Sequence, residues 1–210
     1  MPENDDRNLR ALLVPKVMAA KDRFDVNFER DYKPPQVGDW LETENVLPAA
    51  LEPYFLRANT GPRWMLGGVM SRPFINASQC AGKFAISSIE SSNQYAAEAS
   101  PFKRWLTFPT VDHCFSVMEG VLRVQLKGED DSTEVREGQT LVISAGQAFT
   151  LEFASRYVRA ITFTNGPGIE HLIHTAGQAY TSYVLPDQAS ACDEERLSVV
   201  CGELGLQIEV

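Results

Sequence analysis

The sequence contains few of the residues that bind metals or cross-link chains. Its 210 residues include three histidines and four cysteines. Cys80, Cys114, Cys192 and Cys201 lie far apart and form no Cys-x-x-Cys pair, so nothing indicates a zinc knuckle or a redox dithiol. We expect reduced thiols within the core.

Long apolar runs and a basic surplus are also missing. No apolar stretch approaches the roughly 18 residues of a membrane span, and residues 1–6 are acidic where a secretory signal is basic and then apolar. The 28 acidic and 19 basic residues give a formal charge of -9, which disfavours nucleic acid and anionic membranes as partners. We therefore expect a cytoplasmic protein whose partner is a small organic molecule.

The segment 105–153 contains the strongest structural pattern. Short runs of Val, Leu, Ile and Phe alternate with turns centred on Gly120, Gly128 and Gly138. Short apolar runs with such breaks are typical of strands in an all-β barrel or sandwich.

The flanking segments extend this pattern. Further strands are predicted near residues 54–57, 64–69, 83–89 and 157–163. Gly67 and Gly68 within one of them predict a bulge or a close backbone approach. Residues 71–82 are expected to form a loop or an irregular edge.

Helices are predicted at both ends of the chain. Residues 7–24 have apolar residues at helical intervals, with Pro15 expected to kink or split the run, and residues 31–36 form an extended connector. This arm packs on its own subunit or crosses to a partner, and we favour a homodimer. Near the C-terminus, one helix is expected from Ile169 and another at 193–204, with its acidic first residues at the positive end of the helix dipole.

Two boxes of the sequence resemble those of the cupin superfamily. The first runs from His113 through Glu119-Gly120 to Val124, and the second from Glu137-Gly138 to Phe149. Residues 54–57, 63–68 and 168–174 are similar to single-domain quercetin 2,3-dioxygenase-like cupins.

The resemblance covers roughly residues 53–180 and implies a fold. It implies an all-β cupin barrel, that is, a double-stranded β-helix or jelly roll. We expect an N-terminal arm at 1–39, the barrel at 40–180, and a C-terminal helix and tail at 181–210 that pack on the barrel or on a dimer partner.

The chain departs from the family at the metal-ligand positions. In metal-binding cupins the boxes supply a His-x-His pair, a Glu and a third His, and these positions fall here on Leu106, Phe108, His113 and Phe149. A first-row metal needs three or four N, O or S donors within about 2.0 to 2.3 Å, and one imidazole does not provide them. We expect a pocket without metal or cofactor.

A shifted register is the alternative for this metal site. It would bring Asp112 into a ligand position. Adjacent strand residues point to opposite faces, so Asp112 and His113 both face inward only if the preceding turn breaks the alternation.

An apolar and aromatic lining with one imidazole is expected inside the barrel. The predicted lining consists of Leu106, Phe108, His113, Phe115, Phe149 and Leu151. Such a pocket suits a planar organic ligand. His113, beside Asp112, is the predicted general acid or base, because the imidazole pKa of about 6.5 is near neutral pH.

Hydrogen-bond donors for the substrate or a developing oxyanion are expected from Arg57, Trp64 and Arg123. The structural alternative for His113 is a hydrogen-bonded core histidine. His171 and His174 share one helical face, but no third donor stands at a matching spacing, so we expect solvated histidines.

Three functions are compatible with these residues. The first is a metal-independent cupin enzyme that isomerises, cyclises (possibly by a pericyclic step) or dehydrates a small aromatic or polyketide-like molecule in natural-product biosynthesis. The second is a metal-dependent quercetinase-like dioxygenase. The third is a cupin that binds a small molecule without catalysis.

Overall fold

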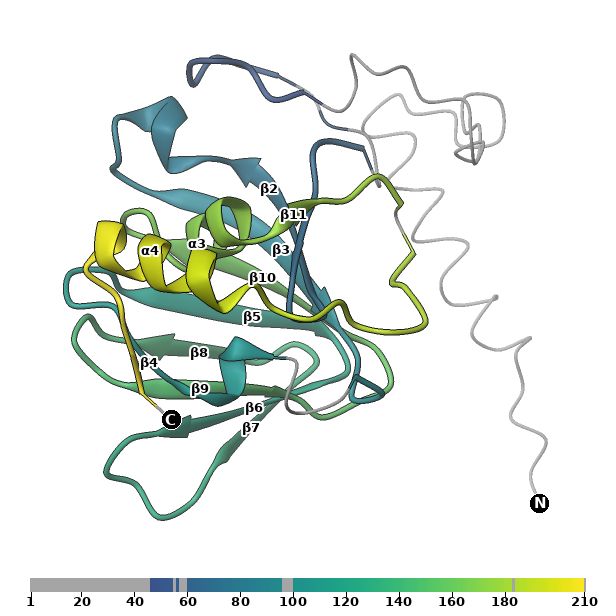
Figure 1. Ribbon diagram of the computed structural model, residues 1–210, viewed down its shortest axis with the longest axis vertical. Helices are drawn as coiled ribbons and strands as arrows, with labels where there is room; N and C mark the ends of the chain where they lie inside the picture. Colours follow the sequence, from purple (N-terminus) through teal and green to yellow (C-terminus); the bar gives the residue numbers. More distant parts are fainter. Residues whose placement is uncertain (1–45, 55, 57–59, 96–99, 183, 210) are drawn as a thin grey trace, which may run out of the picture. The chain divides into compact units, whose positions relative to one another are not determined.

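Two antiparallel sheets make up most of the computed structural model (Figure 1). The structure describes residues 46–209 apart from 55, 57–59, 96–99 and 183, and these belong to one compact unit, Leu41–Val210. The predicted arm at 1–39, with its helix at 7–24 and its connector at 31–36, lies outside the described residues. Arg57 also lies outside them.

The first sheet, called sheet A, has the strand order β11-β1-β2-β3-β10-β5-β8. Its strands are β1 (Trp64–Leu66), β2 (Val69–Ile75), β3 (Ala85–Ser91), β5 (His113–Glu119), β8 (Thr140–Ile143), β10 (Val158–Thr164) and β11 (Gln178–Ala179). The second, sheet B, has the order β12-β4-β9-β6-β7. Its strands are β4 (Trp105–Thr107), β6 (Val121–Leu126), β7 (Thr133–Arg136), β9 (Phe149–Phe153) and β12 (Gln207–Glu209).

The predicted all-β architecture is confirmed, with one correction. Within the described residues, hydrogen bonds do not close either sheet into a barrel, and no described strand belongs to both sheets. The two sheets are instead joined by side chains, because alternate residues of β5, β9 and β10 are buried between them.

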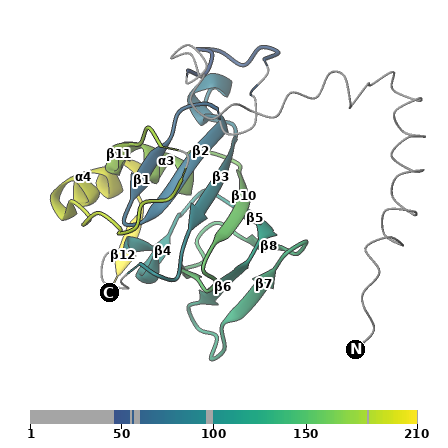
Figure 2. The same cartoon turned by 90° about the vertical axis from the view of Figure 1, so that its right-hand side faces the viewer.

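Two α-helices pack beside the sheets (Figure 2). Helix α3 (Ile169–Ala176) contacts β1, β2, β3 and α4 (Glu194–Leu204). Both match the predicted C-terminal helices, and Asp193 caps α4 by accepting a hydrogen bond from the Arg196 N–H at 3.0 Å. Two short 3-10 helices, Ala77–Cys80 and Pro101–Lys103, complete the described elements.

The strand predicted at 64–69 is two strands. Gly67 and Gly68 have φ values of 53° and 81°, so they form a tight hairpin turn between β1 and β2 instead of a bulge. The loop or irregular edge predicted at 71–82 is wrong for its first part, because β2 continues to Ile75 and lies between β1 and β3 in the sheet.

In the described residues, no helix is long and apolar enough to cross a membrane. The predicted cytoplasmic location and homodimer stay predictions.

Two turn glycines with the same backbone angle allow a test of this fold. Gly120 has φ 79° and Gly138 φ 78°, but a Cβ at Gly120 would lie 2.3 Å from the Tyr157 carbonyl oxygen, whereas a Cβ at Gly138 meets no atom within 4 Å. We expect Gly138→Ala to cost about 1 kcal/mol of unfolding free energy from left-handed strain alone. Gly120→Ala adds a backbone clash and is expected to cost roughly 3 kcal/mol or more in urea unfolding. Equal losses for the two variants would contradict the close approach of the β9–β10 turn to Gly120.

Candidate functional site

His113 lies at the centre of an aromatic cluster between the sheets. Its ring centroid is 4.4 Å from that of Phe108, 5.5 Å from Phe149 and 5.9 Å from Phe115. His113 is 1% exposed, and the three phenylalanines are buried as well. The predicted inward orientation of these side chains is therefore confirmed, but they pack against one another.

Both ring nitrogens of His113 are engaged. The Nε2 atom accepts a hydrogen bond from the Ile169 N–H at 3.2 Å, and the ring makes a second hydrogen bond with the backbone of Val111. A nitrogen that accepts carries no proton, so the imidazole is neutral with its proton on Nδ1. This geometry matches the structural alternative, a hydrogen-bonded core histidine, while its catalytic role stays a prediction.

The N-terminus of α3 meets a second buried titratable group that the sequence did not single out. The Glu170 carboxylate accepts from the Gly168 N–H at 3.1 Å and from the Thr164 hydroxyl at 3.4 Å. His113 and Glu170 together satisfy N–H groups that the first turn of a helix leaves unpaired. The visible signal was an acidic residue next to the predicted helix start at Ile169.

Burial changes the pKa of both groups. Desolvation lowers the pKa of His113 to about 4, against smaller opposing effects of the Val111 hydrogen bond and the Asp112 charge. Desolvation also raises the pKa of Glu170 to about 7, against the backbone and Thr164 hydrogen bonds that favour its charged form.

The residues at the cupin metal-ligand positions do not fit a metal. Leu106 and Phe149 are cross-strand partners on β4 and β9, both are buried, and Phe108 stacks on Phe149 at 6.2 Å. Among the described residues, no group of three or more His, Cys, Asp or Glu side chains is placed to hold an ion. The donor set consists of one imidazole with both nitrogens occupied.

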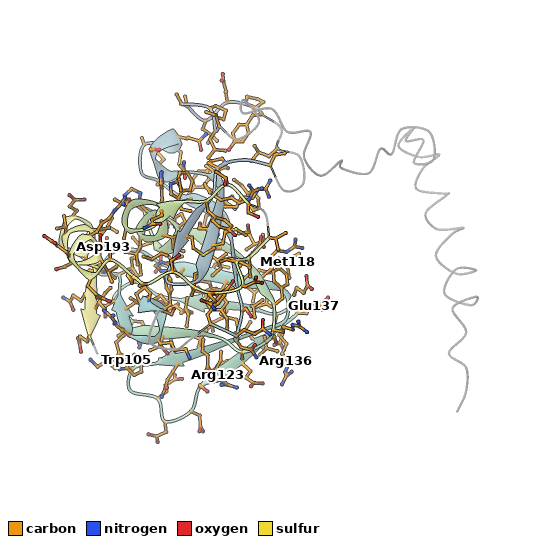
Figure 3. All side chains as sticks on the ribbon, turned by 45° about the vertical axis from the view of Figure 1, so that its right-hand side comes forward. Trp105, Met118, Arg123, Arg136, Glu137 and Asp193 are labelled. Atoms are coloured by element: carbon orange, nitrogen blue, oxygen red, sulfur yellow. The ribbon has the colours of Figure 1, made fainter. Side chains whose placement is uncertain are left out.

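Two residues that were predicted to join His113 in catalysis lie elsewhere. Asp112 is turned outward and accepts from the Ala145 N–H at 2.7 Å and from the Asn165 side-chain amide at 2.5 Å, so it stabilises a loop. Arg123 lies on the outer side of β6, where it bonds Glu152 at 2.8 Å and Glu134 at 3.0 Å (Figure 3). Its neighbours Leu122 and Val124 face the core, so strand alternation turns Arg123 away from His113.

The remaining predicted ligand-binding residues lie in different parts of the structure. Trp64 contacts His174 of α3, with ring centroids 3.7 Å apart, and packs against the core. His171 and His174 are half-buried and 6.5 Å apart. Burial lowers the pKa of both, so they are not the freely solvated histidines that we expected. Leu151 reaches a cavity.

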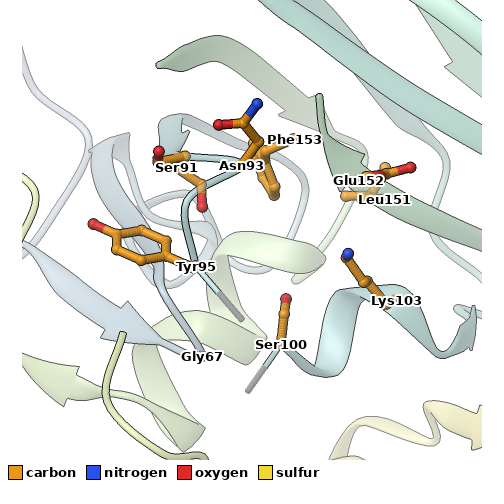
Figure 4. Close-up of a pocket in the computed structure, with 10 residues that line it drawn as sticks. Gly67, Ser91, Asn93, Tyr95, Ser100, Lys103, Leu151, Glu152 and Phe153 are labelled. Carbon is orange, nitrogen blue, oxygen red and sulfur yellow. The ribbon is translucent and has the colours of Figure 1, made fainter. Parts of the chain in front are cut away.

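That cavity, called the mouth cavity, is small and has a mixed polar and apolar lining (Figure 4). It has a volume of about 40 Å³, enough for one or two waters, and its lining includes Ser91, Asn93, Tyr95, Ser100, Lys103 and Leu151. Part of the segment 91–103 thus lines this cavity. Residues 96–99 lie outside the described part.

A larger cavity, called the outer cavity, opens where β3 ends and β10 begins. Its volume is about 500 Å³, and its lining includes Glu90, Tyr95, Tyr157, Val184, Leu185 and Pro186. In the described part of the chain, neither this cavity nor the mouth cavity has His113 in its wall. Of these two cavities, the outer cavity at the strand ends is the one with room for a ligand.

A hydrogen-bonded acid and phenol form one wall of the outer cavity. The Tyr157 hydroxyl donates to Oε2 of Glu90 at 2.6 Å, across the pairing of β3 with β10. Burial raises the pKa of Tyr157, and the hydrogen bond to Glu90 raises it further, so Tyr157 remains protonated at neutral pH. The sequence did not indicate this pair, because the expected lining came from residues 106–151 and Glu90 and Tyr157 both lie outside that segment.

No family model matches the sequence, and no curated protein matches it. Among solved structures, the Clostridium difficile EutQ protein aligns over 47% of this chain and 62% of its own length, at 14% identity and a TM-score of 0.37. Ectoine synthase from P. lautus aligns over 57% and 79%, at 15% identity and a TM-score of 0.41. The cupin domain of Schizosaccharomyces pombe Cnp3 aligns over 49% and 68%, at 11% identity and a TM-score of 0.36. The chain thus spans less than two thirds of the EutQ protein, and similarity at this level assigns neither a family nor a reaction.

The buried state of His113 predicts how stability depends on pH. Its pKa is lowered in the folded protein, so the unfolded chain binds the proton more tightly between pH 6.5 and 4. Stability from this group is complete above pH 6.5 and is lost as pH falls toward 4, by up to about 3 kcal/mol. We expect the difference in unfolding free energy between wild type and His113→Gln, measured in urea, to shrink over this range. A constant difference would contradict a neutral, buried imidazole.

Glu170 makes the unfolding free energy depend on pH in the opposite direction. Its pKa is raised in the folded protein, so its contribution is lost as pH rises from 4.5 toward 7. Wild type alone therefore shows a flattened profile, since the two groups offset each other. The unfolding free energy of Glu170→Gln minus that of wild type is expected to increase between pH 4.5 and pH 7. The increase should be up to about 3 kcal/mol in the same urea titrations.

Proposed function

We propose that the chain is a metal-independent cupin that acts on a small, flat organic molecule in the outer cavity. The observation that carries this proposal is the Glu90–Tyr157 pair, with 2.6 Å between its oxygens, at the wall of a cavity of about 500 Å³. Ligand cavities commonly measure about 300 to 1,000 Å³ and combine an apolar lining with few polar groups. Val184, Leu185 and Pro186 supply the apolar side here.

The pair supports proton transfer as the reaction. Tyr157 holds Oε2 of Glu90, while Oε1 of Glu90 makes no hydrogen bond to any residue that the structure describes. Oε1 is thus available to accept a proton from a ligand hydroxyl or enol, and the resulting acid returns that proton to carbon. One O–H bond breaks and one C–H bond forms, so an isomerisation needs no further reactant, and cyclisation or dehydration can follow the same start.

His113 has no step in this proposal. Its nitrogens are bonded to the protein, and substrate would have to displace Phe108, Phe115 or Phe149 to reach it. The quercetinase-like alternative needs metal ligands, which the described side chains do not supply at the cupin positions. The third hypothesis, binding without catalysis, uses the same cavity. Isotope exchange distinguishes it from the enzymatic hypothesis.

The binding site is tested with β-naphthol, a flat phenol. Wild-type protein is expected to bind it, and Glu90→Gln to weaken the dissociation constant roughly 10-fold or more, because a hydrogen bond to a charged acceptor is lost. Glu129→Gln, the same change on the exposed β6–β7 hairpin, is the matched control and should leave the constant unchanged. Titration calorimetry measures all three, and equal affinities for wild type and Glu90→Gln would place the ligand elsewhere.

Catalysis is tested by isotope exchange. In heavy water the proton of β-naphthol moves between oxygen and the adjacent ring carbon through the keto tautomer, which deuterates that carbon. We expect wild type to accelerate this exchange by at least about 10²-fold over buffer, as general bases do, and Glu90→Gln to abolish the effect. Proton NMR follows the loss of the ring signal. Tight binding without accelerated exchange would identify a binding protein.

A further inference from the structure

Tyr95 stands between the mouth cavity and the outer cavity. Its side chain lines both, and Ser92 is the other residue that the two linings share. The two cavities are therefore neighbours separated by one aromatic ring and the start of one loop.

The Tyr95 ring is fixed from two sides. Its hydroxyl donates to the Pro186 carbonyl at 2.7 Å, which ties it to the far wall of the outer cavity. The ring also lies directly on the backbone of Gly68, where a Cβ would come within 2.7 Å of ring carbon Cδ2 and within 2.9 Å of the Ala189 Cβ. Only glycine leaves room for the ring in this β1–β2 turn.

The two cavities differ in chemistry. The outer cavity joins apolar side chains to the Glu90–Tyr157 pair. The lining of the mouth cavity includes the polar residues Ser91, Asn93, Ser100, Lys103 and Glu152 beside Gly67, Leu151 and Phe153. Glu152 is bonded to Arg123, whereas Lys103 makes no ion pair with the residues that the structure describes. An acidic group that entered the mouth cavity would meet Lys103.

We propose that Tyr95 is the specificity-determining wall of this site. It restricts the ligand to the outer cavity, which admits a flat molecule about as large as fused bicyclic rings. It excludes longer molecules whose acidic far end would otherwise reach Lys103. This inference rests on the proposed function, because it concerns the ligand of the same cavity.

The test compares two probes: β-naphthol, and β-naphthol extended on its far ring by a benzoic acid group. Wild type is expected to bind the short probe at least about 10-fold more tightly than the long one. Tyr95→Ala removes the ring and should improve binding of the long probe at least about 10-fold, and adding Lys103→Met to Tyr95→Ala should cancel that gain.

Tyr180→Phe is the matched control. The Tyr180 hydroxyl also donates to a backbone carbonyl of the same loop, that of Val184 at 2.7 Å, but its ring does not stand between the cavities. This variant loosens the loop to a similar degree and should leave the ratio of the two dissociation constants unchanged. If Tyr180→Phe shifts the ratio of dissociation constants as much as Tyr95→Ala does, loop mobility sets specificity. That result would contradict the role of Tyr95 as the wall.

Failure of this inference and failure of the proposed function give different results. If wild type and Tyr95→Ala both bind β-naphthol with the same ratio of dissociation constants, the wall is wrong and the function stands. If neither binds it, the function is wrong. A crystal structure of Tyr95→Ala then tests whether the Tyr95 ring separates the two cavities. One joined cavity is then expected, and collapse of the 184–187 loop into the vacated space would overturn it.

Discussion

Aromatic packing around His113 is the contact on which the described fold depends. Phe149 comes from sheet B, Phe115 from sheet A, and the hydrogen bond from Ile169 fixes α3 to the same ring. Burying each phenylalanine contributes about 1.5 to 3 kcal/mol, so this cluster supplies a large share of the interaction between the layers. The imidazole must stay neutral, because a charge surrounded by hydrocarbon would lose its hydration without a compensating partner.

This packing fills the space around His113 with aromatic side chains. A central pocket would require the loss of buried rings, and a Phe→Ala change in a core costs about 3 to 5 kcal/mol. One space that is open without such a cost lies beside Glu90, Tyr95 and Tyr157, where β3 ends and β10 begins. The aromatic cluster thus fills the space between the sheets, and the outer cavity lies outside that cluster.

The sequence predicted the elements better than the site. Apolar alternation identified β5 and β10, and the acidic residues after Asp193 identified the start of α4, because these signals are local. Gly67 and Gly68 were predicted to form a bulge or a close backbone approach. The pairing of β1 with β2 makes them a hairpin turn, and the close approach is present at Gly68, which the Tyr95 ring contacts.

The site was harder to predict because it depends on contacts between distant segments. Glu90 and Tyr157 are 67 residues apart, and their contact follows from the register of β3 against β10, which no local pattern specifies. The outward position of Arg123 was available from alternation with Leu122 and Val124, but that signal was outweighed by its suitability as an oxyanion donor.

The walls of the outer cavity come mostly from connecting segments. Gln94 and Tyr95 follow β3, Arg156 and Tyr157 precede β10, and residues 184–187 belong to the long connection between β11 and α4. Such segments contribute little to the core, so their side chains can change while the aromatic cluster stays intact. The core therefore constrains the two sheets, and under the proposed function the ligand is selected by residues on which the stability of those sheets depends little. Tyr95 is the exception, since its ring is seated on the β1–β2 turn and its hydroxyl is tied to Pro186, so it belongs both to the scaffold and to the wall.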